Sequence, residues 1–340
     1  MDFRPTEDQR DLRAGVRGLL EGRYGREALR AAVDAAAGTG TGAGTDADAG
    51  GGSGAGAAVD RGLWRELGEA GFFALRLPES EGGVGLGLPE AVLVFEEAGR
   101  ALVPGPLVAT HLAAGVVPGA AAGTAVVTAF DLAGDLVAYL GEADAVLGAA
   151  VLPVGEPVRA VDPLTPLHRV ARPGGTEASA SAPGYGSASA SAYAPGSGSA
   201  YVSEGALLTA ALQVGSALRT VELAVRYAGE REQFGQPIGA FQAVKHGCAQ
   251  MLVRAEVART AVYAAAVTGD PGEAAGAKLL ADEAAVRNAR DCLQVHGGMG
   301  FTWEADVHLH LKRAWVRAEQ WRTAAEAEEL LAAELLDSAG

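Results

Sequence analysis

The chain has 340 residues, and its 27 Lys and Arg against 42 Asp and Glu leave a formal net charge of −15 at neutral pH. That length allows one large domain or two to three smaller ones, and so acidic a balance argues against nucleic acid or an anionic membrane as a partner. Two cysteines, Cys248 and Cys292, exclude a disulfide framework and lack zinc-ligand spacing. No apolar stretch reaches the ~18 residues of a membrane span, and the charged start lacks a signal core. We therefore expect a cytoplasmic protein.

Two segments of low complexity divide the chain. Residues 35–58 are mainly Ala, Gly, Thr, Ser and Asp, and residues 174–200 are built from Ala, Ser, Gly, Pro and Tyr. Neither has an apolar period that could offset the entropy lost on ordering, so we expect disordered insertions or flexible loops. The predicted domains are an N-terminal helical domain at 1–118, a truncated middle β domain at 119–203 and a C-terminal helical domain at 204–340.

The first elements are predicted to be helices. Thr6 precedes two acidic residues and a helical repeat of leucine and valine, which is typical of a helix start. A short helix is expected around Trp64, ending near Gly71, and another over residues 90–102. The middle region then alternates short apolar runs with turns, which is typical of strands. These runs lie at residues 126–130, 135–140, 145–152 and 169–173.

Long helical patterns make up the last part of the chain. They cover residues 207–227, 241–267, 272–295 and 308–336. Four such helices with short connections predict an antiparallel bundle. The expected fold class is therefore α+β, with an N-terminal helical domain, a small middle β domain and a C-terminal antiparallel four-helix bundle.

The first segment that could carry chemistry is the loop between the first two long helices. Arg231, Gln233 and Phe234 lie there, closed by Gly235 and Pro237. A guanidinium, an amide and an aromatic ring on such a loop can bind a diphosphate and stack on a flat ring. The other interpretation is an arginine that caps helix carbonyls and a phenylalanine in the core.

The second such segment follows the third long helix. Gly297 and Gly298 would let backbone N–H groups approach an anion closely, or would simply form a helix C-cap. His308 and His310 are two residues apart, which places them on different faces of a helix. We therefore expect no metal site.

Together the two segments resemble the signature stretches of the acyl-CoA dehydrogenase family. They read REQFGQPIGAFQAVKH at residues 231–246 and QVHGGMGFTWEADVHLHLKRA at 294–314. Residues 63–91 and the LVPGPL stretch at 102–107 resemble that family's helical domain. The resemblance covers the first and third parts of the chain well and the middle poorly, where the tryptophan that faces the flavin in relatives is missing.

This resemblance implies a flavoprotein that removes two hydrogens from Cα and Cβ of an acyl-CoA thioester. A carboxylate takes the α-proton, hydride passes to FAD, and an electron-acceptor flavoprotein receives the electrons. The cofactor-binding residues that the motifs carry over are Arg231, Gln233, Phe234, Gln242, Gln294, Gly297 and Gly298. The first four would contact FAD bound mainly by a neighbouring subunit, and the last three would approach its adenosine diphosphate end.

The catalytic base is the feature that this sequence does not supply. Most relatives have it in a Tyr-Glu-Gly-Thr stretch, and the matching residues 320–323 place Trp321 at the position of the glutamate. Glu319 comes two residues early, which is ~200° around a helix. A minority of relatives carry the base on the preceding long helix, and that position holds Gly205, next to Glu204. Each glutamate can also be a solvated charge at a helix end.

Some relatives with the HGGxGFTWE form work as two-subunit assemblies, in which one chain keeps the base and its partner lacks it. We predict that this chain is of the second kind, sharing an FAD site with a catalytic chain in the dehydrogenation of an acyl-CoA. One alternative is a complete homo-oligomeric dehydrogenase with a displaced base, either Glu204 or Glu319. The other is a non-redox acyl-CoA-binding module.

Overall fold

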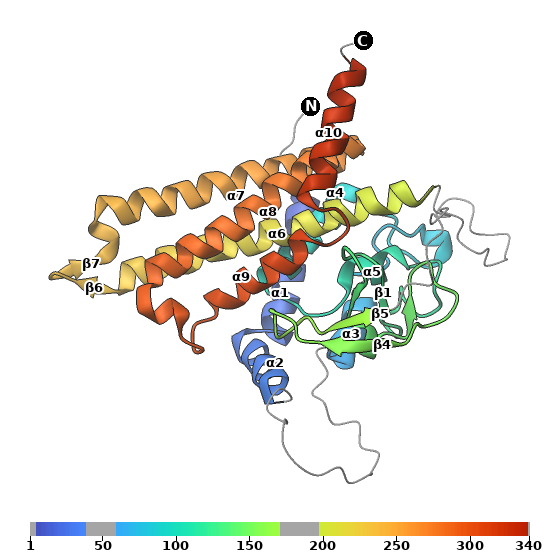
Figure 1. Ribbon diagram of the computed structural model, residues 1–340, viewed down its shortest axis with the longest axis horizontal. Helices are drawn as coiled ribbons and strands as arrows, with labels where there is room; N and C mark the ends of the chain where they lie inside the picture. Colours follow the sequence, from blue (N-terminus) through green and yellow to red (C-terminus); the bar gives the residue numbers. More distant parts are fainter. Residues whose placement is uncertain (1–4, 39–58, 171–196, 339–340) are drawn as a thin grey trace, which may run out of the picture.

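The computed structural model describes residues 5–38, 59–170 and 197–338. Helices come first, short strands second and long helices last (Figure 1), which is the predicted α+β order. The first helices are α1 (Glu7–Arg23), α2 (Arg26–Gly38), α3 (Arg61–Glu69), α4 (Leu88–Arg100) and α5 (Leu107–Leu112), with a 3-10 turn η1 at Glu79–Glu81. The middle strands are β1 (Val127–Thr128), β2 (Leu136–Ala138), β3 (Ala145–Val146), β4 (Gly155–Val158) and β5 (Leu167–Val170), with η2 at Leu140–Glu142.

The C-terminal part begins with the longest helix. Its elements are α6 (Ser197–Glu230), β6 (Glu232–Gln233), β7 (Gln236–Pro237), η3 (Ile238–Ala240), α7 (Gln242–Thr268), α8 (Pro271–His296), η4 (Gly297–Phe301), α9 (Val307–Ala318) and α10 (Ala324–Ser338). The two low-complexity segments lie outside the described residues, except for their helical edges. Residues 35–38 belong to α2, because their alanines favour a helix, and residues 197–200 begin α6.

Helix α1 begins where the sequence predicts. The Thr6 hydroxyl accepts a hydrogen bond from the Gln9 N–H at 3.2 Å, and the Gln9 side chain accepts from the Thr6 N–H at 2.9 Å. This reciprocal capping box satisfies two backbone donors that the helix itself leaves unpaired. Leu20 on the inner face of α1 is buried in the same core as Trp64 and Phe73.

The middle region holds two small sheets. Strands β1 and β3 pair in parallel, and β2, β5 and β4 form an antiparallel sheet in that order. Strand β4 was not predicted, because its Gly-Glu-Pro-Val sequence has no apolar run. The region is tied to the C-terminal helices by Arg313 of α9, which forms a buried ion pair with Asp162.

Helices α6 to α9 form the predicted bundle, and α4 packs against α6 (Figure 1). Glycines allow the backbones of α4 and α6 to touch each other. A Cβ added at Gly215 would lie 1.8 Å from the Glu96 carbonyl oxygen, and one at Gly99 would lie 2.0 Å from that of Leu212. No larger residue fits at these two positions without separating the helices.

The single helix predicted over residues 308–336 is wrong. The chain forms α9 and α10, with a break at residues 319–323 where Trp321 takes a left-handed φ of 62°. Buried Lys278 of α8 contributes to the break, because its ammonium donates to the last carbonyl oxygens of α9, at 3.1 Å for Arg317 and 3.4 Å for Ala318. The apolar period continues across these residues and therefore did not reveal the break.

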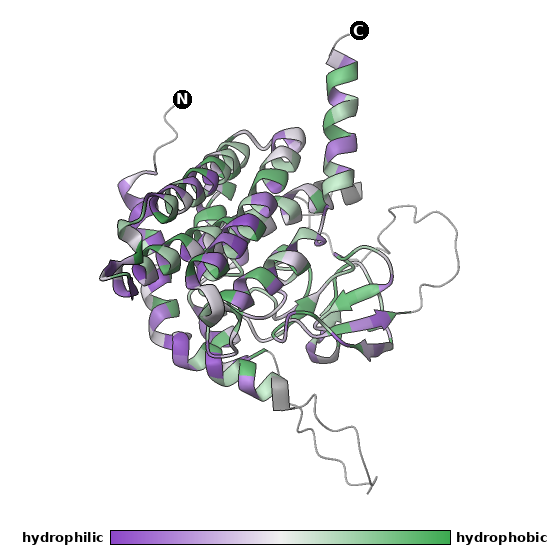
Figure 2. Cartoon of the chain, turned by 60° about the vertical axis from the view of Figure 1, so that its left-hand side comes forward, coloured by the Kyte–Doolittle hydropathy of each residue, from purple (hydrophilic) through white to green (hydrophobic). Residues whose placement is uncertain are grey.

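Beyond the break, α10 stands away from the bundle (Figure 2). Ala327 near its start is buried, whereas Leu335 and Leu336 near its end are 71% and 76% exposed. The end of α10 therefore carries two leucines that no part of residues 5–38, 59–170 and 197–338 covers.

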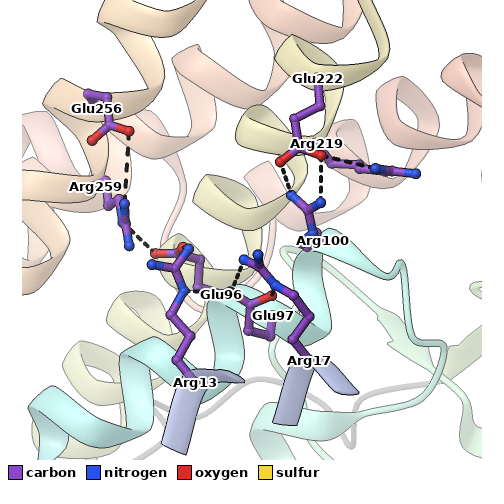
Figure 3. Close-up of polar contacts among 9 residues, drawn as sticks. All are labelled: Arg13, Arg17, Glu96, Glu97, Arg100, Arg219, Glu222, Glu256 and Arg259. Atoms are coloured by element: carbon purple, nitrogen blue, oxygen red, sulfur yellow. Dashed lines mark hydrogen bonds and ion pairs between the residues drawn. The ribbon is translucent and has the colours of Figure 1, made fainter. Parts of the chain in front are cut away.

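Buried charges attach α1 to the rest of the molecule (Figure 3). The Glu97 carboxylate of α4 accepts from Arg13 at 2.6 Å and from Arg17 at 2.7 Å, and both arginines come from α1. Its neighbour Glu96 pairs with Arg13 at 2.7 Å and with Arg259 of α7 at 3.0 Å. The other members drawn are Arg100, Arg219, Glu222 and Glu256. Three helices distant in sequence are thus joined through two adjacent glutamates.

Candidate functional site

The two signature segments meet at one end of the bundle. The β6–β7 hairpin follows α6, and η4 follows α8; Figure 1 places both at the end away from strands β1 to β5. The Tyr227 ring near the end of α6 stacks on His296 at the end of α8, with ring centroids 4.2 Å apart. Because the ends of α6 and α8 are adjacent, the segment at residues 231–242 lies close to the segment at residues 294–298.

The hairpin presents its polar and aromatic side chains to solvent. Phe234 is 92% exposed and has a left-handed φ of 55°, so the interpretation that places it in the core is wrong. Arg231 and Gln242 are exposed, and no described residue accepts a hydrogen bond from the Arg231 guanidinium. The Gln233 amide donates to the Glu232 carbonyl oxygen at 2.8 Å. Arg231 and Phe234 are thus available to a ligand or to another chain.

The glycine segment is open in the same way. Gly297 caps α8, with a positive φ of 59° and its N–H donating to the Gln294 carbonyl oxygen. A Cβ added at Gly297 or Gly298 would meet nothing within 4 Å, and the Gln294 side chain is exposed. The capping interpretation is therefore correct for Gly297, and the open space around it also permits close approach of a ligand.

Gly205 and Trp321, the two positions at which the resemblance leads us to expect a base, lie against each other. A Cβ added at Gly205 would fall 2.3 Å from the Trp321 indole, so that indole fills the space beside α6. Glu204 forms an ion pair with Arg76 and is 21% exposed. Glu319 is exposed at the C-terminal end of α9. Trp321 and Gly205 thus form one packed contact.

A buried polar pocket beside Trp321 has no signal in the sequence. The Asp131 carboxylate accepts from the Gln320 amide at 2.8 Å, and the Asp131 carbonyl oxygen accepts from the Trp321 N–H at 2.6 Å. Arg317, only 3% exposed, lines the same pocket. Asp131 and Gln320 are 189 positions apart in the chain, and no motif joins them.

Known proteins are similar to this chain over most of its length. The model of the acyl-CoA dehydrogenase N-terminal domain matches residues 47–128, and that of the C-terminal domain matches residues 199–325. Acyl-CoA dehydrogenase IpdE2 of Mycobacterium tuberculosis (strain H37Rv) is 35% identical over 352 residues, which cover 98% of this chain and 99% of that protein. The chain belongs to the acyl-CoA dehydrogenase family.

A further relative and two solved structures are also similar to this chain. Acyl-CoA dehydrogenase IpdE2 of Mycolicibacterium smegmatis is 32% identical, covering 91% of this chain and 93% of that protein. The ChsE4–ChsE5 complex of Mycobacterium tuberculosis has a chain with a TM-score of 0.75 at 23% identity, covering 99% of both chains. Butyryl-CoA dehydrogenase of Megasphaera elsdenii has a TM-score of 0.73 at 19% identity, covering 99% of this chain and 100% of the other. The predicted family and fold are confirmed, and members of the family are flavoproteins that bind FAD.

In the ranges that the structure describes, no helix is both long and apolar enough to span a bilayer. Over the same ranges, no three His, Cys, Asp or Glu side chains gather so as to hold a metal ion.

Proposed function

We propose that this chain is one subunit of a two-chain acyl-CoA dehydrogenase, in which it completes the FAD site and a partner chain of the same family supplies the base. The contact of Trp321 with Gly205 carries the proposal. By the count along the motifs these residues stand at the two positions where relatives carry the base, and the indole of one fills the space that a side chain at the other would need. A dehydrogenase that acts alone needs a carboxylate at one of them.

The two glutamates nearby give little support to a displaced base. The Glu204 carboxylate is engaged with Arg76, and moving it into the Gly205 position would bring it against the indole. Glu319 lies in the solvent at the end of α9. A general base must come within hydrogen-bond reach of the proton that it takes, which favours a carboxylate from another chain.

The exposed end of the bundle suits the adenosine diphosphate end of FAD. Arg231 offers a guanidinium with no described partner, Phe234 offers an exposed ring, and Gly297 and Gly298 leave their backbone open. Such groups neutralise a diphosphate and pack on a flat ring. Because they are exposed on the single chain, they fit a cofactor that a second chain covers. Residues 119–170 contain no tryptophan for the flavin ring.

In the proposed reaction the partner's carboxylate takes the α-proton of an acyl-CoA thioester. FAD, when bound, supplies the acceptor for the Cβ hydride, and an acceptor flavoprotein then takes the electrons. The residues of this chain bind and orient: Arg231 balances the charge of the diphosphate, and Phe234 excludes water beside it. Trp321 closes the position that would hold a second base.

The direct test compares this chain alone with this chain mixed with a candidate catalytic chain. The measurements are the visible flavin absorbance and acyl-CoA oxidation with an artificial electron acceptor. We expect no turnover by the chain alone and turnover by the mixture above that of the candidate by itself. Turnover by the chain alone would overturn the proposal. A chain that stays colourless with added FAD and every partner would indicate a non-redox acyl-CoA-binding module.

Replacing the two glutamates separates a shared site from a displaced base. In the reconstituted pair, we expect Glu204→Gln and Glu319→Gln each to keep turnover within ~2-fold, because neither carboxylate takes the proton. Loss of a true general base costs at least ~10²-fold in rate. A loss of that size in either variant would identify the residue as the base and contradict the proposal. Removal of the partner's candidate base is the positive control.

Arg231→Ala is expected to weaken FAD retention by about ten-fold, because it removes a charge-assisted hydrogen bond worth ~1.5 kcal/mol or more. The measurement is flavin absorbance per protein after gel filtration of the reconstituted pair. Arg226→Ala is the matched control, since this arginine is also exposed and lies on α6 before the hairpin. Flavin content that is the same in both variants would remove Arg231 from the cofactor site.

A further inference from the structure

The hairpin that carries Arg231 and Phe234 lies in the solvent. Every residue from Arg231 to Pro237 is exposed, and each of its two strands is two residues long. A two-stranded hairpin without a packed face is marginally stable at best in water. The position of this hairpin must therefore come from the segments at its two ends.

Both ends of the hairpin are attached to the last turns of α6. The Arg231 N–H donates to the Tyr227 carbonyl oxygen at 2.8 Å, so the turn that contains Tyr227 leads directly into the first strand. After the second strand, a Cβ added at Gly239 would lie 3.0 Å from the Ala228 carbonyl oxygen, so η3 folds back onto the same turn. A movement of the end of α6 would therefore move the hairpin with it.

The Tyr227 ring holds that turn against α8. It stacks on the His296 ring, with the ring centroids 4.2 Å apart and the ring planes at 20° to each other. His296 is the last residue of α8 and directly precedes Gly297, where the glycine segment begins. The stack therefore joins the two segments that carry the predicted cofactor-binding residues.

The His296 ring is itself held in place by its own chain. Its Nδ1 lies 2.8 Å from the Cys292 carbonyl oxygen. Because a carbonyl oxygen can only accept, Nδ1 carries a proton and is the donor in this hydrogen bond. A Cβ added at Gly300 would lie 3.0 Å from the His296 Cβ, so the turn after α8 closes over the same residue. The orientation of the imidazole is thus fixed before any ligand arrives.

We propose that Tyr227 and His296 are positioning residues, whose stack sets the distance between the hairpin and the glycine segment. This role rests on the proposed function, in which Arg231 and Phe234 on one side and Gly297 on the other contact one FAD molecule. Binding groups that are already in place lose less conformational freedom when the ligand binds. The stack therefore raises the affinity for FAD by ordering the residues that contact it.

The first test is amide hydrogen exchange of the purified chain, which needs neither FAD nor a partner. The Ile238 N–H, which donates to the Arg231 carbonyl oxygen, reports on the hairpin. It should exchange ~2- to 10-fold faster in His296→Leu, the range expected when one aromatic pair is lost. In His296→Phe, which keeps a ring for the stack, the exchange should stay close to that of the parent. Unchanged exchange in His296→Leu would overturn the proposal.

The matched control for this exchange measurement is His308→Leu. His308 lies on α9 and stacks on Trp303 with ring centroids 5.1 Å apart and ring planes at 24°. The substitution therefore breaks a histidine stack of the same kind, away from the end of α6. It should leave the exchange of the Ile238 N–H as in the parent. Faster exchange there in His308→Leu as well would mean that the effect is general, and would contradict the assigned role.

The second test is flavin retention by the reconstituted pair after gel filtration. His296→Leu should retain FAD ~2- to 10-fold less well, and His296→Phe should restore retention. Unchanged retention in His296→Leu overturns the positioning role; the proposed function stands in that case if Arg231→Ala still weakens retention. If neither substitution changes retention, the proposed function fails as well.

A pair of variants on α6 covers the case in which His296→Leu does not fold. Tyr227→Leu and Tyr227→Phe change the other ring of the stack and should give the same loss and the same rescue. Combining Tyr227→Leu with His296→Leu should cost no more than either alone, because the second substitution acts on a stack that is already broken. Losses that add up would show that the two rings act separately and would overturn the proposal.

Discussion

Gly215→Ala is expected to lower the free energy of unfolding by about 3 kcal/mol, the upper part of the usual range for overpacking. The added Cβ would lie 1.8 Å from the Glu96 carbonyl oxygen. That neighbour is backbone in the middle of α4 and cannot rotate away as a side chain could. The two helices must therefore separate, and the side chains buried between them lose contacts along their length.

The control for this variant is Gly18→Ala in α1. Gly18 is exposed within the helix, and an added Cβ would meet nothing within 4 Å. Alanine there should raise stability by up to ~1 kcal/mol through helix propensity alone. Urea unfolding followed by circular dichroism measures both. If Gly215→Ala were as stable as the parent, α4 and α6 would not be in backbone contact.

Glu97→Gln is expected to cost about 3 kcal/mol, the lower end of the cost of breaking a buried ion pair. The Glu97 side chain is 1% exposed and holds both Arg13 and Arg17. A glutamine keeps the shape but removes the charge, and its amide also brings donors toward two guanidiniums. Because both arginines reach the solvent in part, the loss should stay at the lower end of that range.

The dependence on pH gives this variant a second signature. Burial alone would raise the pKa of Glu97, but the hydrogen bonds from Arg17 and Arg13 lower it below the ordinary 4.5. Its contribution is therefore complete above that value and is lost as the pH falls through the lowered pKa. Glu97→Gln should lose stability at neutral pH and approach the parent in acid. A constant difference at every pH would contradict this account.

The matched control is Glu66→Gln. Glu66 pairs with Arg23 at the surface, where the two side chains are 32% and 57% exposed. Exposed pairs contribute little to stability because solvent screens them, so this substitution should change the free energy of unfolding little. A loss as large as that of Glu97→Gln would show that burial does not decide the contribution.

The sequence predicted this fold wherever a local signal was sufficient. The start of α1 after Thr6, the order of helices and strands, and the helix ends around residues 231–242 follow from neighbouring residues. The break near Trp321 does not, because the Lys278 hydrogen bonds that contribute to it come from another helix. The apolar period predicts a helix from neighbouring residues only. The Lys278 ammonium, which donates to the end of α9, lies about forty positions earlier in the chain.

The candidate site was likewise predictable from the sequence only in part. Counting along the motifs places Trp321 and Gly205 at the two base positions, but only the structure brings them into contact. The pocket around Arg317 is absent from any pattern, since its polar groups come from three separate regions of the chain. Each is an ordinary surface residue type that becomes unusual only through burial.

The hairpin that carries Phe234 has a consequence for the speed of assembly. A hydrogen bond of 2.8 Å between the Ile238 N–H and the Arg231 carbonyl oxygen closes the turn, and the aromatic ring is already presented to solvent. A surface that covers this ring gains up to ~3 kcal/mol from burial without first ordering the loop. Docking at this end of the bundle should therefore proceed as a rigid-body encounter, and the lifetime of the complex should vary more than its rate of formation.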